Sequence, residues 1–307
     1  MKKIIAILLL VSLLAFAFVG CGKKDETPAG EKAYTLSLAV DSTFSGVKTA
    51  NTVVALVTDA DGKIVACRFD SAESSLTVAE GELVTNPAVS TKVEIGDGYT
   101  GMNAGSWAKQ AKAFEDFVIG KTAAEVAALE ITNTLVTGCT MTNSMNTFKS
   151  LLAKAFAYER KVSFNTDKTF TLGVSIAQSL SGSLADESAS VAASFAAAVL
   201  VDGKVVAGMI DENSRSFTIS YNADDEAVEA TEASYPGTKN EQGEAYGKMD
   251  SGFWFEQAQA FANTANGKTV AELANLADSG DALKEAGCSI YAGNYKTALI
   301  KAATAAR

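Results

Sequence analysis

The sequence of 307 residues contains no histidine, and this absence removes several classes of function. Ser-His-Asp and Cys-His catalysis, HExxH zinc sites, imidazole haem ligation and imidazole proton shuttles all require that side chain. Most hydrolase and metalloenzyme chemistries are therefore excluded before any motif is considered.

Basic side chains are also scarce. The chain has 26 lysines and arginines against 36 acidic residues, which gives a formal net charge of -10. Proteins that bind nucleic acids neutralise phosphates with a basic stripe or patch. Because the sequence has no such stripe, we expect neither a nucleic-acid partner nor a polybasic lipid-binding surface.

Only four cysteines are present, at positions 21, 67, 139 and 288. Cys21 belongs to the N-terminal segment discussed next, so three remain for the rest of the chain. An odd number spread over such a length does not make a disulfide framework. We expect Cys67, Cys139 and Cys288 to be free thiols in a chain large enough to build its own hydrophobic cores.

The N-terminus begins with Lys2 and Lys3, followed by an unbroken apolar run from Ile4 to Gly20. The run ends at Cys21, and a polar segment follows. This junction resembles a bacterial lipoprotein signal, in which Cys21 becomes the lipidated first residue of the mature protein. We expect a signal peptide over 1–20 and a tether over 21–32. The alternative is an uncleaved N-terminal membrane helix, and both interpretations place the remaining chain outside the cytoplasm on a membrane anchor.

The remaining sequence contains an internal repeat. Residues 91–127 align without a gap with residues 238–274, and the Asp-Gly-Lys of 61–63 returns at 202–204. Self-similarity over this length indicates a tandem duplication. We predict one repeat over 33–162 and a second over 163–307.

Each repeat has the same order of expected elements. Residues 52–71 and 194–213 predict hairpins with Asp-Gly at the turn. A helix follows, on which Trp107, Ala111, Phe114 and Val118 share one face. A short helix after Gly-Lys-Thr and a closing helix complete the repeat. The predicted fold class is α+β: two tandem homologous modules, each an antiparallel β hairpin or sheet followed by helices.

The segment before each closing helix is the most informative motif. It reads Val-Thr-Gly-Cys-Thr from Val136 and Ala-Gly-Cys-Ser from Ala286. The free N–H groups and the dipole at a helix N-terminus favour a phosphate. Thr140 and Ser289 would present a hydroxyl there, whereas the structural alternative is a turn with a capping hydroxyl.

The Thr-Gly-Cys-Thr of residues 137–140 resembles the Ser/Thr-Gly-Ala-Thr signature of FMN-binding domains. These domains occur in flavin subunits of sodium-pumping quinone oxidoreductases and Rnf complexes, and in flavinylated lipoproteins of Gram-positive extracellular electron transfer. The Asp-Gly-Lys hairpin, the Trp-x-x-Gln-Ala helix and the Gly-Lys-Thr helix are similar to the same family, over nearly all of the mature chain. The resemblance implies that a flavin transferase esterifies the FMN phosphate to Thr140 and Ser289, within turns formed by Thr137, Gly138 and Gly287. Because Ala286 replaces the first hydroxyl residue of the signature, the first repeat is the better match.

Aromatic and thioether side chains near these motifs have two interpretations. The Gly-rich connectors carry Tyr99, Met102, Tyr246 and Met249, which either line a flavin pocket or pack against the core. Trp107 and Trp254 are expected in the core because their helical phase places them with buried phenylalanines. The acidic segment from Asp224 to Glu232 is expected to be a solvated loop.

The function implied by the resemblance is a membrane-anchored, extracytoplasmic electron carrier with covalent FMN. Its partners would be the flavin transferase, a membrane electron donor and an extracellular acceptor, and a carrier fits better than an enzyme with its own substrate. The alternative is a flavin-free surface lipoprotein that binds a small ligand or an envelope protein, with a possible pheromone peptide released from residues 4–20.

Overall fold

The computed structural model describes residues 30–100, 102–223 and 227–307. The expected signal peptide, Cys21 and most of the tether lie outside the described residues. Among the described helices, none is long and apolar enough to cross a membrane.

Strands and helices follow one another in a clear order along the chain. The strands of the first half are β1 (Lys32–Ser45), β2 (Lys48–Asp59), β3 (Ile64–Ser75), β4 (Val78–Ala79), β5 (Glu82–Leu83) and β6 (Asn86–Val89). Its helices are α1 (Lys92–Ile95), the 3-10 turn η1 (Gly96–Gly98), α2 (Trp107–Val118), α3 (Ala123–Ala127) and α4 (Thr142–Ala157). The strands of the second half are β7 (Val162–Thr166), β8 (Thr171–Ser183), β9 (Ser188–Val201), β10 (Lys204–Asn222), β11 (Ala227–Glu232), β12 (Lys248–Met249) and β13 (Gly252–Phe253). Its helices are α5 (Lys239–Gln242), η2 (Gly243–Tyr246), α6 (Trp254–Asn263), α7 (Val270–Leu273), α8 (Asp281–Glu285) and α9 (Gly293–Thr304).

The long strands form two antiparallel sheets. The first has the order β3-β2-β1-β7 and the second the order β11-β10-β9-β8-β6. With both antiparallel sheets and helices in each half, the fold is α+β, as the sequence predicts.

Both faces of each sheet are buried. Along β2, Val53 and Val57 point into a core shared by the two sheets, whereas Val54 and Leu56 point into a core beneath the helices. Successive side chains of a strand point to opposite faces, so a strand that is covered on both faces needs an unbroken apolar run. This explains the sequence from Val53 to Val57, in which no polar residue interrupts the strand.

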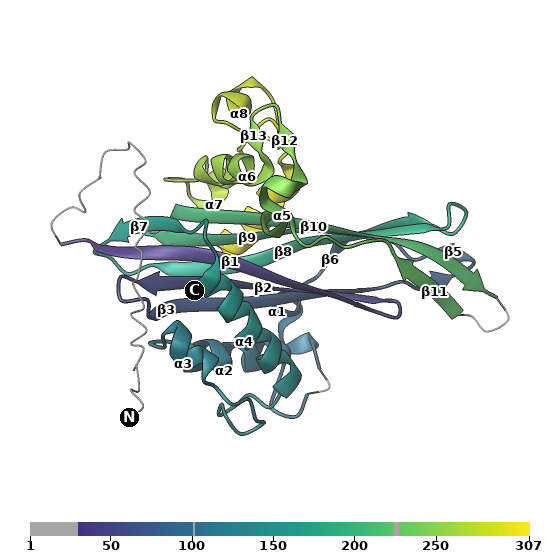
Figure 1. Cartoon of the computed structure of the whole chain (residues 1–307), viewed down its shortest axis with the longest axis horizontal. Helices are drawn as coiled ribbons and strands as arrows, with labels where there is room; N and C mark the ends of the chain where they lie inside the picture. The colour runs from purple at the N-terminus through teal and green to yellow at the C-terminus, as the bar shows by residue number, and fades with distance from the viewer. Residues whose placement is uncertain (1–29, 101, 224–226) are drawn as a thin grey trace, which may run out of the picture.

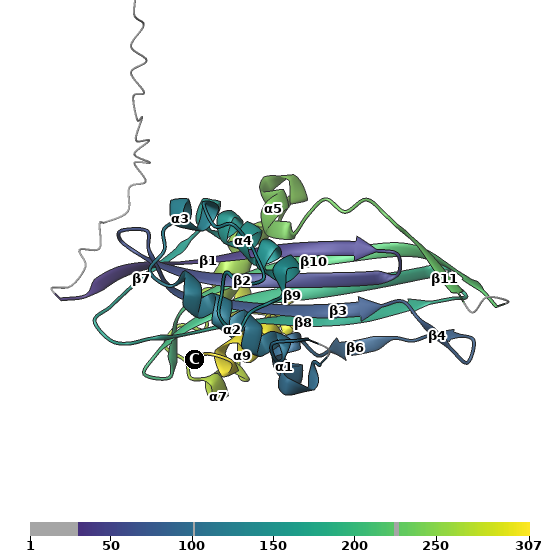
Figure 2. The same ribbon diagram turned by 90° about the horizontal axis from the view of Figure 1, so that it is seen from below.

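The result is a four-layer arrangement of helices, sheet, sheet and helices (Figure 1). Helices α2 and α4 lie across the outer face of the first sheet, which is clear when the molecule is seen from below (Figure 2). Helices α6 and α9 cover the outer face of the second sheet. Trp107 and Trp254 are each 1% exposed in these outer cores, so their predicted core location is confirmed.

The two halves exchange strands. Strand β7 follows the first half but pairs with β1 in the first sheet, and β6 precedes the second half but pairs with β8 in the second sheet. Each sheet is therefore completed by the chain on the other side of the α1–α4 segment. The expected boundary between residues 162 and 163 falls inside this exchange.

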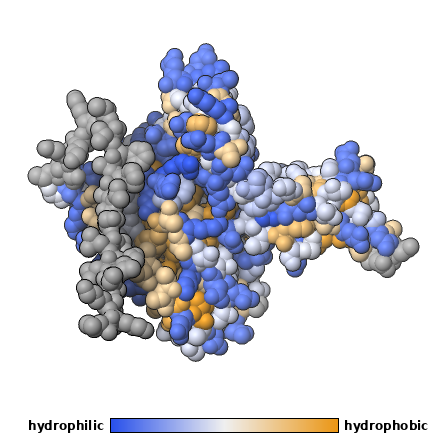
Figure 3. Space-filling model, in the orientation of Figure 1, coloured by the Kyte–Doolittle hydropathy of each residue, from blue (hydrophilic) through white to orange (hydrophobic). Residues whose placement is uncertain are grey.

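The sheets extend beyond the helices as an arm, to the right in Figures 1 and 3. The arm has its own small apolar cluster, made of Leu76, Leu83, Leu180, Ala189, Val191, Phe217 and Ile219. A buried polar layer separates it from the main core: Asn51 donates to Gln178 at 2.7 Å, Gln178 donates to Ser74 at 2.8 Å, and Asn213 donates to Asn51 at 2.8 Å. These bonds join the two sheets across the interface and fix their relative register.

Two expectations differ from the structure. The acidic segment expected to be a loop forms the edge strand β11 over Ala227–Glu232, because it completes a ladder with β10. The Gly-rich connectors contain short helices, α1 and α5, each begun by a complete capping box. The signal for the first is present in the sequence as Thr91 followed three residues later by Glu94.

Gly173 provides a test of the contact between β8 and α9. A Cβ at this position would lie 1.8 Å from the carbonyl oxygen of Ala302, whereas a Cβ at Gly208 would meet Leu299 at 3.5 Å. We expect Gly173→Ala to lower the free energy of unfolding by about 2–3 kcal/mol, because backbone cannot move aside cheaply. The matched Gly208→Ala should cost less than about 1 kcal/mol. Urea denaturation of both variants measures the difference, and equal effects would contradict the close approach.

Candidate functional site

The segment that ends at Thr140 forms a tight turn ahead of α4. The Cys139 N–H donates to the Val136 carbonyl at 3.0 Å, and Gly138 has a φ of +83°. A positive φ of this size suits the third position of a type II turn, where glycine is favoured. The turn leaves Thr137 and Thr140 exposed and places Cys139 in the core.

A buried glutamine holds this turn. Gln110 of α2 is fully buried, and its side-chain carbonyl accepts from the Thr140 N–H at 2.9 Å and from the Thr140 hydroxyl at 3.3 Å. Its amide nitrogen donates to the Gly105 carbonyl at 3.0 Å and lies 3.6 Å from the Met102 sulfur. One amide therefore ties the hydroxyl-bearing turn to the Gly-rich connector.

The second half contains the same contact. The Gln257 carbonyl accepts from both the N–H and the hydroxyl of Ser289 at 2.8 Å, and its amide nitrogen donates to Gly252 at 3.0 Å. The turn itself is built differently, because it ends helix α8. Gly287 donates to Lys284 and Cys288 donates to Leu283, the two bonds of a Schellman motif, with Gly287 at a φ of +94°.

The helices that follow have no side-chain cap. Helix α4 begins after Met141 and α9 begins after Ala292, and neither residue provides a capping hydrogen bond. Neither helix has an acidic residue in its first turn. At α4 the Thr142 N–H donates to the Thr140 carbonyl at 3.1 Å, and no side chain at the cap accepts from the other N–H groups of the first turn.

A lysine lies over two aromatic rings in each half. The Lys92 ammonium is 4.9 Å from the Tyr99 ring centre and 5.5 Å from that of Trp107, and it pairs with Glu73 at 2.6 Å. Tyr99 also donates to Glu73, at 3.2 Å.

The equivalent group in the second half is Lys239, at 4.9 Å from Tyr246, at 5.3 Å from Trp254 and at 3.0 Å from Glu212. The pairing of lysine, tyrosine and tryptophan is thus repeated, although the acidic partner comes from a different strand position.

An open cleft lies between α4 and the outer face of the first sheet. It has a volume of about 180 Å³, and its walls include Lys92, Trp107 and Phe148 together with Asn143 and Ser144 from the first turn of α4. A corresponding cleft of about 210 Å³ lies beside α9. Its lining includes Glu212 but neither Trp254 nor Lys239.

Two tyrosines make the second half different. Tyr295 occupies the place of Phe148, accepts from the Trp254 ring N–H at 3.2 Å and donates to Glu212. Tyr291 lies against the first residue of α9, since a Cβ at Gly293 would be 2.5 Å from its hydroxyl oxygen. In the second half the Trp254 N–H, the Tyr295 hydroxyl and Glu212 are therefore linked to one another, and Tyr291 covers the beginning of α9.

A buried aspartate fixes each connector to its sheet. Asp70 of β3 accepts from the backbone N–H groups of Ser71 and Val93 at 2.8 and 3.2 Å, and also from the Thr91 hydroxyl. Asp211 of β10 makes the equivalent bonds to Glu212, Asn240 and Thr238. Burial raises the pKa of both carboxyl groups to about 7.

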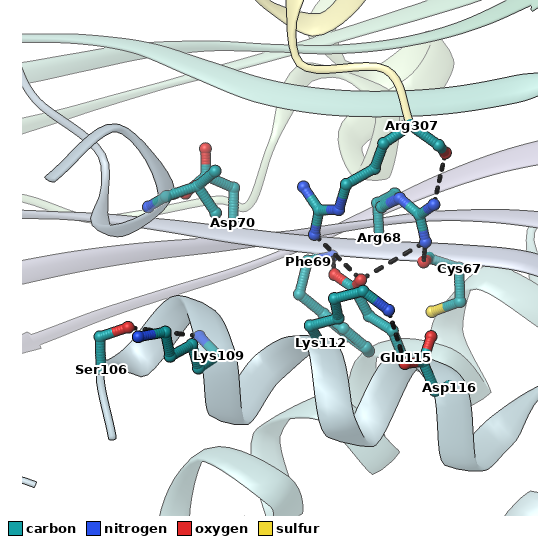
Figure 4. A network of polar contacts seen from close by, with 11 residues as sticks. Cys67, Arg68, Phe69, Asp70, Ser106, Lys109, Lys112, Glu115, Asp116 and Arg307 are labelled. Carbon is teal, nitrogen blue, oxygen red and sulfur yellow. Dashed lines mark hydrogen bonds and ion pairs between the residues drawn. The ribbon is translucent and has the colours of Figure 1, made fainter. Parts of the chain in front are cut away.

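A further buried carboxylate, that of Glu115, lies in the first half only. The equivalent residue of the second half is Ala262. Glu115 accepts from the Phe69 N–H at 2.9 Å and pairs with Arg68 at 3.4 Å and Arg307 at 3.1 Å (Figure 4). Burial raises its pKa, although both guanidinium groups oppose the shift. The network joins α2 and β3 of the first half to the last described residue.

The structure brings together most of the residues selected from the sequence. Thr137, Gly138 and Thr140 form one turn, and Met102 reaches it through Gln110, while Tyr99 lies next to Lys92. Tyr99, Met102 and Met249 are half-buried and pack against the core of their own half, whereas Tyr246 is 38% exposed. Gly287 and Ser289 form the second turn.

Sequence reasoning missed the roles of Gln110, Gln257, Asp70 and Asp211. Each of these residues recurs at the equivalent position of the other half, and this recurrence could have indicated their roles.

The three cysteines after position 21 are free and buried. Burial raises the pKa of the Cys67, Cys139 and Cys288 thiols, so they stay protonated at neutral pH. The described residues contain no group of three or more His, Cys, Asp or Glu side chains that could hold a metal ion.

The chain matches no protein-family model, and no curated protein or solved structure is significantly similar to it.

The buried aspartates predict a pH dependence of stability. Because the folded state keeps a proton that the unfolded state releases above pH 3.8, their contribution is complete below that pH and is lost as the pH rises through about 7. We expect Asp70→Asn and Asp211→Asn to remove part of this fall. Urea denaturation between about pH 4 and pH 8 measures it, with exposed Asp61→Asn as control. If Asp70→Asn and Asp211→Asn keep the slope of the parent chain, the assignment is wrong.

Proposed function

We propose that this protein is a membrane-anchored, extracytoplasmic flavoprotein that carries FMN on Thr140 and relays electrons to extracellular acceptors. The observation that carries the proposal is the exposed Thr140 hydroxyl, held by buried Gln110 directly ahead of an uncapped helix of 16 residues. The Thr-Gly-Cys-Thr motif, read as a resemblance in the sequence, falls on this place.

We further propose that the two halves are homologous modules produced by duplication. Three features that occur in both halves support this: the contact from a glutamine to a hydroxyl, the buried aspartate, and the lysine over two aromatic rings. These are contacts between distant parts of each module, which two unrelated sequences would not be expected to share.

The residues around Thr140 fit an attached phosphate. A phosphoester at the hydroxyl would bring its remaining charge to the first N–H groups of α4, where the helix dipole favours an anion and no acidic side chain opposes it. Tyr99, Met102 and the cleft beside α4 provide aromatic and polarisable surface for a flavin ring. The bound FMN would supply the redox chemistry, and the protein would supply position and solvent access.

Cys139 does not disturb this turn. Its side chain is fully buried in the first-half core, where the related signature has alanine, and Gly138 provides the positive φ. The same substitution occurs at Cys288, which packs in the second-half core.

Ser289 is the poorer acceptor of the two. Its hydroxyl is half-buried and bound to Gln257 at 2.8 Å, and Tyr291 covers the beginning of α9. We therefore propose that FMN is carried mainly or solely by the first module.

The anchor in this proposal is lipid on Cys21. Strand β1 begins at Lys32, eleven residues later, so a short tether would keep the protein close to the outer face of the cell membrane. A phosphoester-bound flavin is not lost by dilution in this location, and it meets partners at a high effective concentration. The required partners are a flavin transferase, a membrane electron donor and an extracellular acceptor.

Replacement of Thr140 tests the attachment. In a host that contains the flavin transferase, we expect Thr140→Ala to abolish flavin fluorescence of the denatured protein in a gel. Thr140→Ser should retain it, because the hydroxyl remains, and Ser289→Ala should retain most of it. Intact-mass measurement counts the flavins.

Fluorescence that survives in the Thr140→Ala, Ser289→Ala double variant would place the attachment elsewhere. A parent protein that is colourless and of unmodified mass in its own organism would instead favour the flavin-free surface lipoprotein.

Replacement of Cys21 tests the anchor. We expect Cys21→Ser to release the protein from the membrane fraction into the medium, because the lipid is attached to the cysteine thiol and serine has no thiol. Detergent partitioning and immunoblotting of both fractions measure the change. Unchanged membrane association would support the uncleaved helix in place of a lipid anchor.

A further inference from the structure

A cavity of about 380 Å³ lies where the two halves meet, away from both hydroxyl-bearing turns. One side is formed by Tyr158, Arg160 and Lys161 in the connection between α4 and β7. The opposite side is formed by α6, mainly by Phe255 and Gln259. Thr140, Ser289 and the two glutamines that hold them are not part of its lining.

The charge at this cavity is unusual for the chain. Of the four arginines, Arg68, Arg215 and Arg307 each pair with a glutamate. Within the described residues, Arg160 has no carboxylate within 4.0 Å, although the chain carries a net charge of -10.

Arg160 is nevertheless held in position. Its guanidinium lies 4.0 Å from the Phe255 ring centre, donates to the Asn240 carbonyl at 3.3 Å and contacts the Tyr158 hydroxyl. A guanidinium has five N–H donors, so these contacts leave donors that match the two oxygens of a carboxylate or phosphate.

Lys161 lies next to it and likewise has no acidic partner within the described residues. Its ammonium donates to the Phe156 carbonyl at 2.8 Å. The acidic group in the lining, Glu256, is engaged as a helix cap by the Phe253 N–H at 2.8 Å. The balance of charge at the cavity is therefore positive.

The remaining walls are flat and apolar. Tyr158 and Phe255 contribute rings, and Val162, Met209 and Ile210 contribute aliphatic surface. A cavity of this size with an apolar wall and a few placed polar groups is typical of small-molecule sites.

We propose that this cavity binds a small organic anion, with a carboxylate or phosphate on Arg160 and Lys161 and a flat apolar ring between Tyr158 and Phe255. The ligand would contact both halves of the chain, so its binding would stabilise the whole fold. This site is independent of the proposed flavin attachment.

Isothermal titration calorimetry at neutral pH on the full chain tests the proposal with five probes. 2-Naphthoate and 2-naphthyl phosphate combine ring and charge, and they distinguish the two anionic groups. 2-Naphthol has the ring without the charge, and acetate and inorganic phosphate have the charge without the ring. We expect saturable binding of at least one combined probe, at least about tenfold tighter than that of 2-naphthol or of the ring-free anions.

Variants locate the binding. Arg160→Gln should weaken it about tenfold or more, because a charge-assisted bidentate contact is lost. Lys112→Gln removes an exposed charge from α2, which does not line the cavity, and it should leave the affinity unchanged. Thermal unfolding of each variant with and without the probe gives a second measure, since the probe should raise the Tm of the parent chain and of Lys112→Gln but not of Arg160→Gln.

Three results would overturn the proposal: no saturable binding of either combined probe at millimolar concentration, equal affinity for 2-naphthol, or equal affinity of the parent chain and Arg160→Gln. If Arg160→Gln fails to fold, Lys161→Gln decides the matter. Its side chain is exposed and makes one bond to backbone, so an unchanged affinity in that folded variant would equally overturn the assignment.

Discussion

The apolar interface between the two sheets is the constraint on which the rest of the structure depends. Val53 and Val57 of the first sheet meet Phe195 and Val199 of the second, and each sheet also borrows an edge strand from the other half. A half that folded alone would expose an entire sheet face and leave a strand unpaired. Burial of both faces supplies the driving force for folding, and it makes the two halves one cooperative unit.

Polar side chains also contribute to this interface, through hydrogen bonds between the two sheets. Hydrogen bonds link Asn51 to Gln178 and Asn213 to Asn51 between the sheets, at the level where the main core meets the arm. A register slip by one residue would leave these amides buried without partners, which costs more than their bonds gain. The same principle operates at Gln110, whose single side chain ties together two backbone segments that would otherwise be independent loops.

Local elements were predictable from the sequence, whereas their assembly was not. The helix carrying Trp107 and Phe114 and the Asp-Gly hairpins follow from periodicity and turn chemistry, both of which act within a few residues. Strand β6 covers only Asn86–Val89, too few residues for a pattern, and its partner lies about ninety residues away. The motif predicts the turn at Thr140. The sequence shows that Gln110 recurs as Gln257, but it does not show that this side chain binds the turn.

The two halves differ most clearly at the position that is Phe148 in the first and Tyr295 in the second. Replacing Phe148 by Tyr295 adds a hydroxyl to a buried position, and the Trp254 N–H and Glu212 satisfy it. Glu212 also pairs with Lys239, so its charge is engaged before any ligand arrives. In the first half Phe148 has no hydroxyl to satisfy, and Lys92, which pairs with Glu73 at 2.6 Å, lies on the wall of the cleft. This difference between the halves is the structural basis of our proposal that the first half carries the flavin.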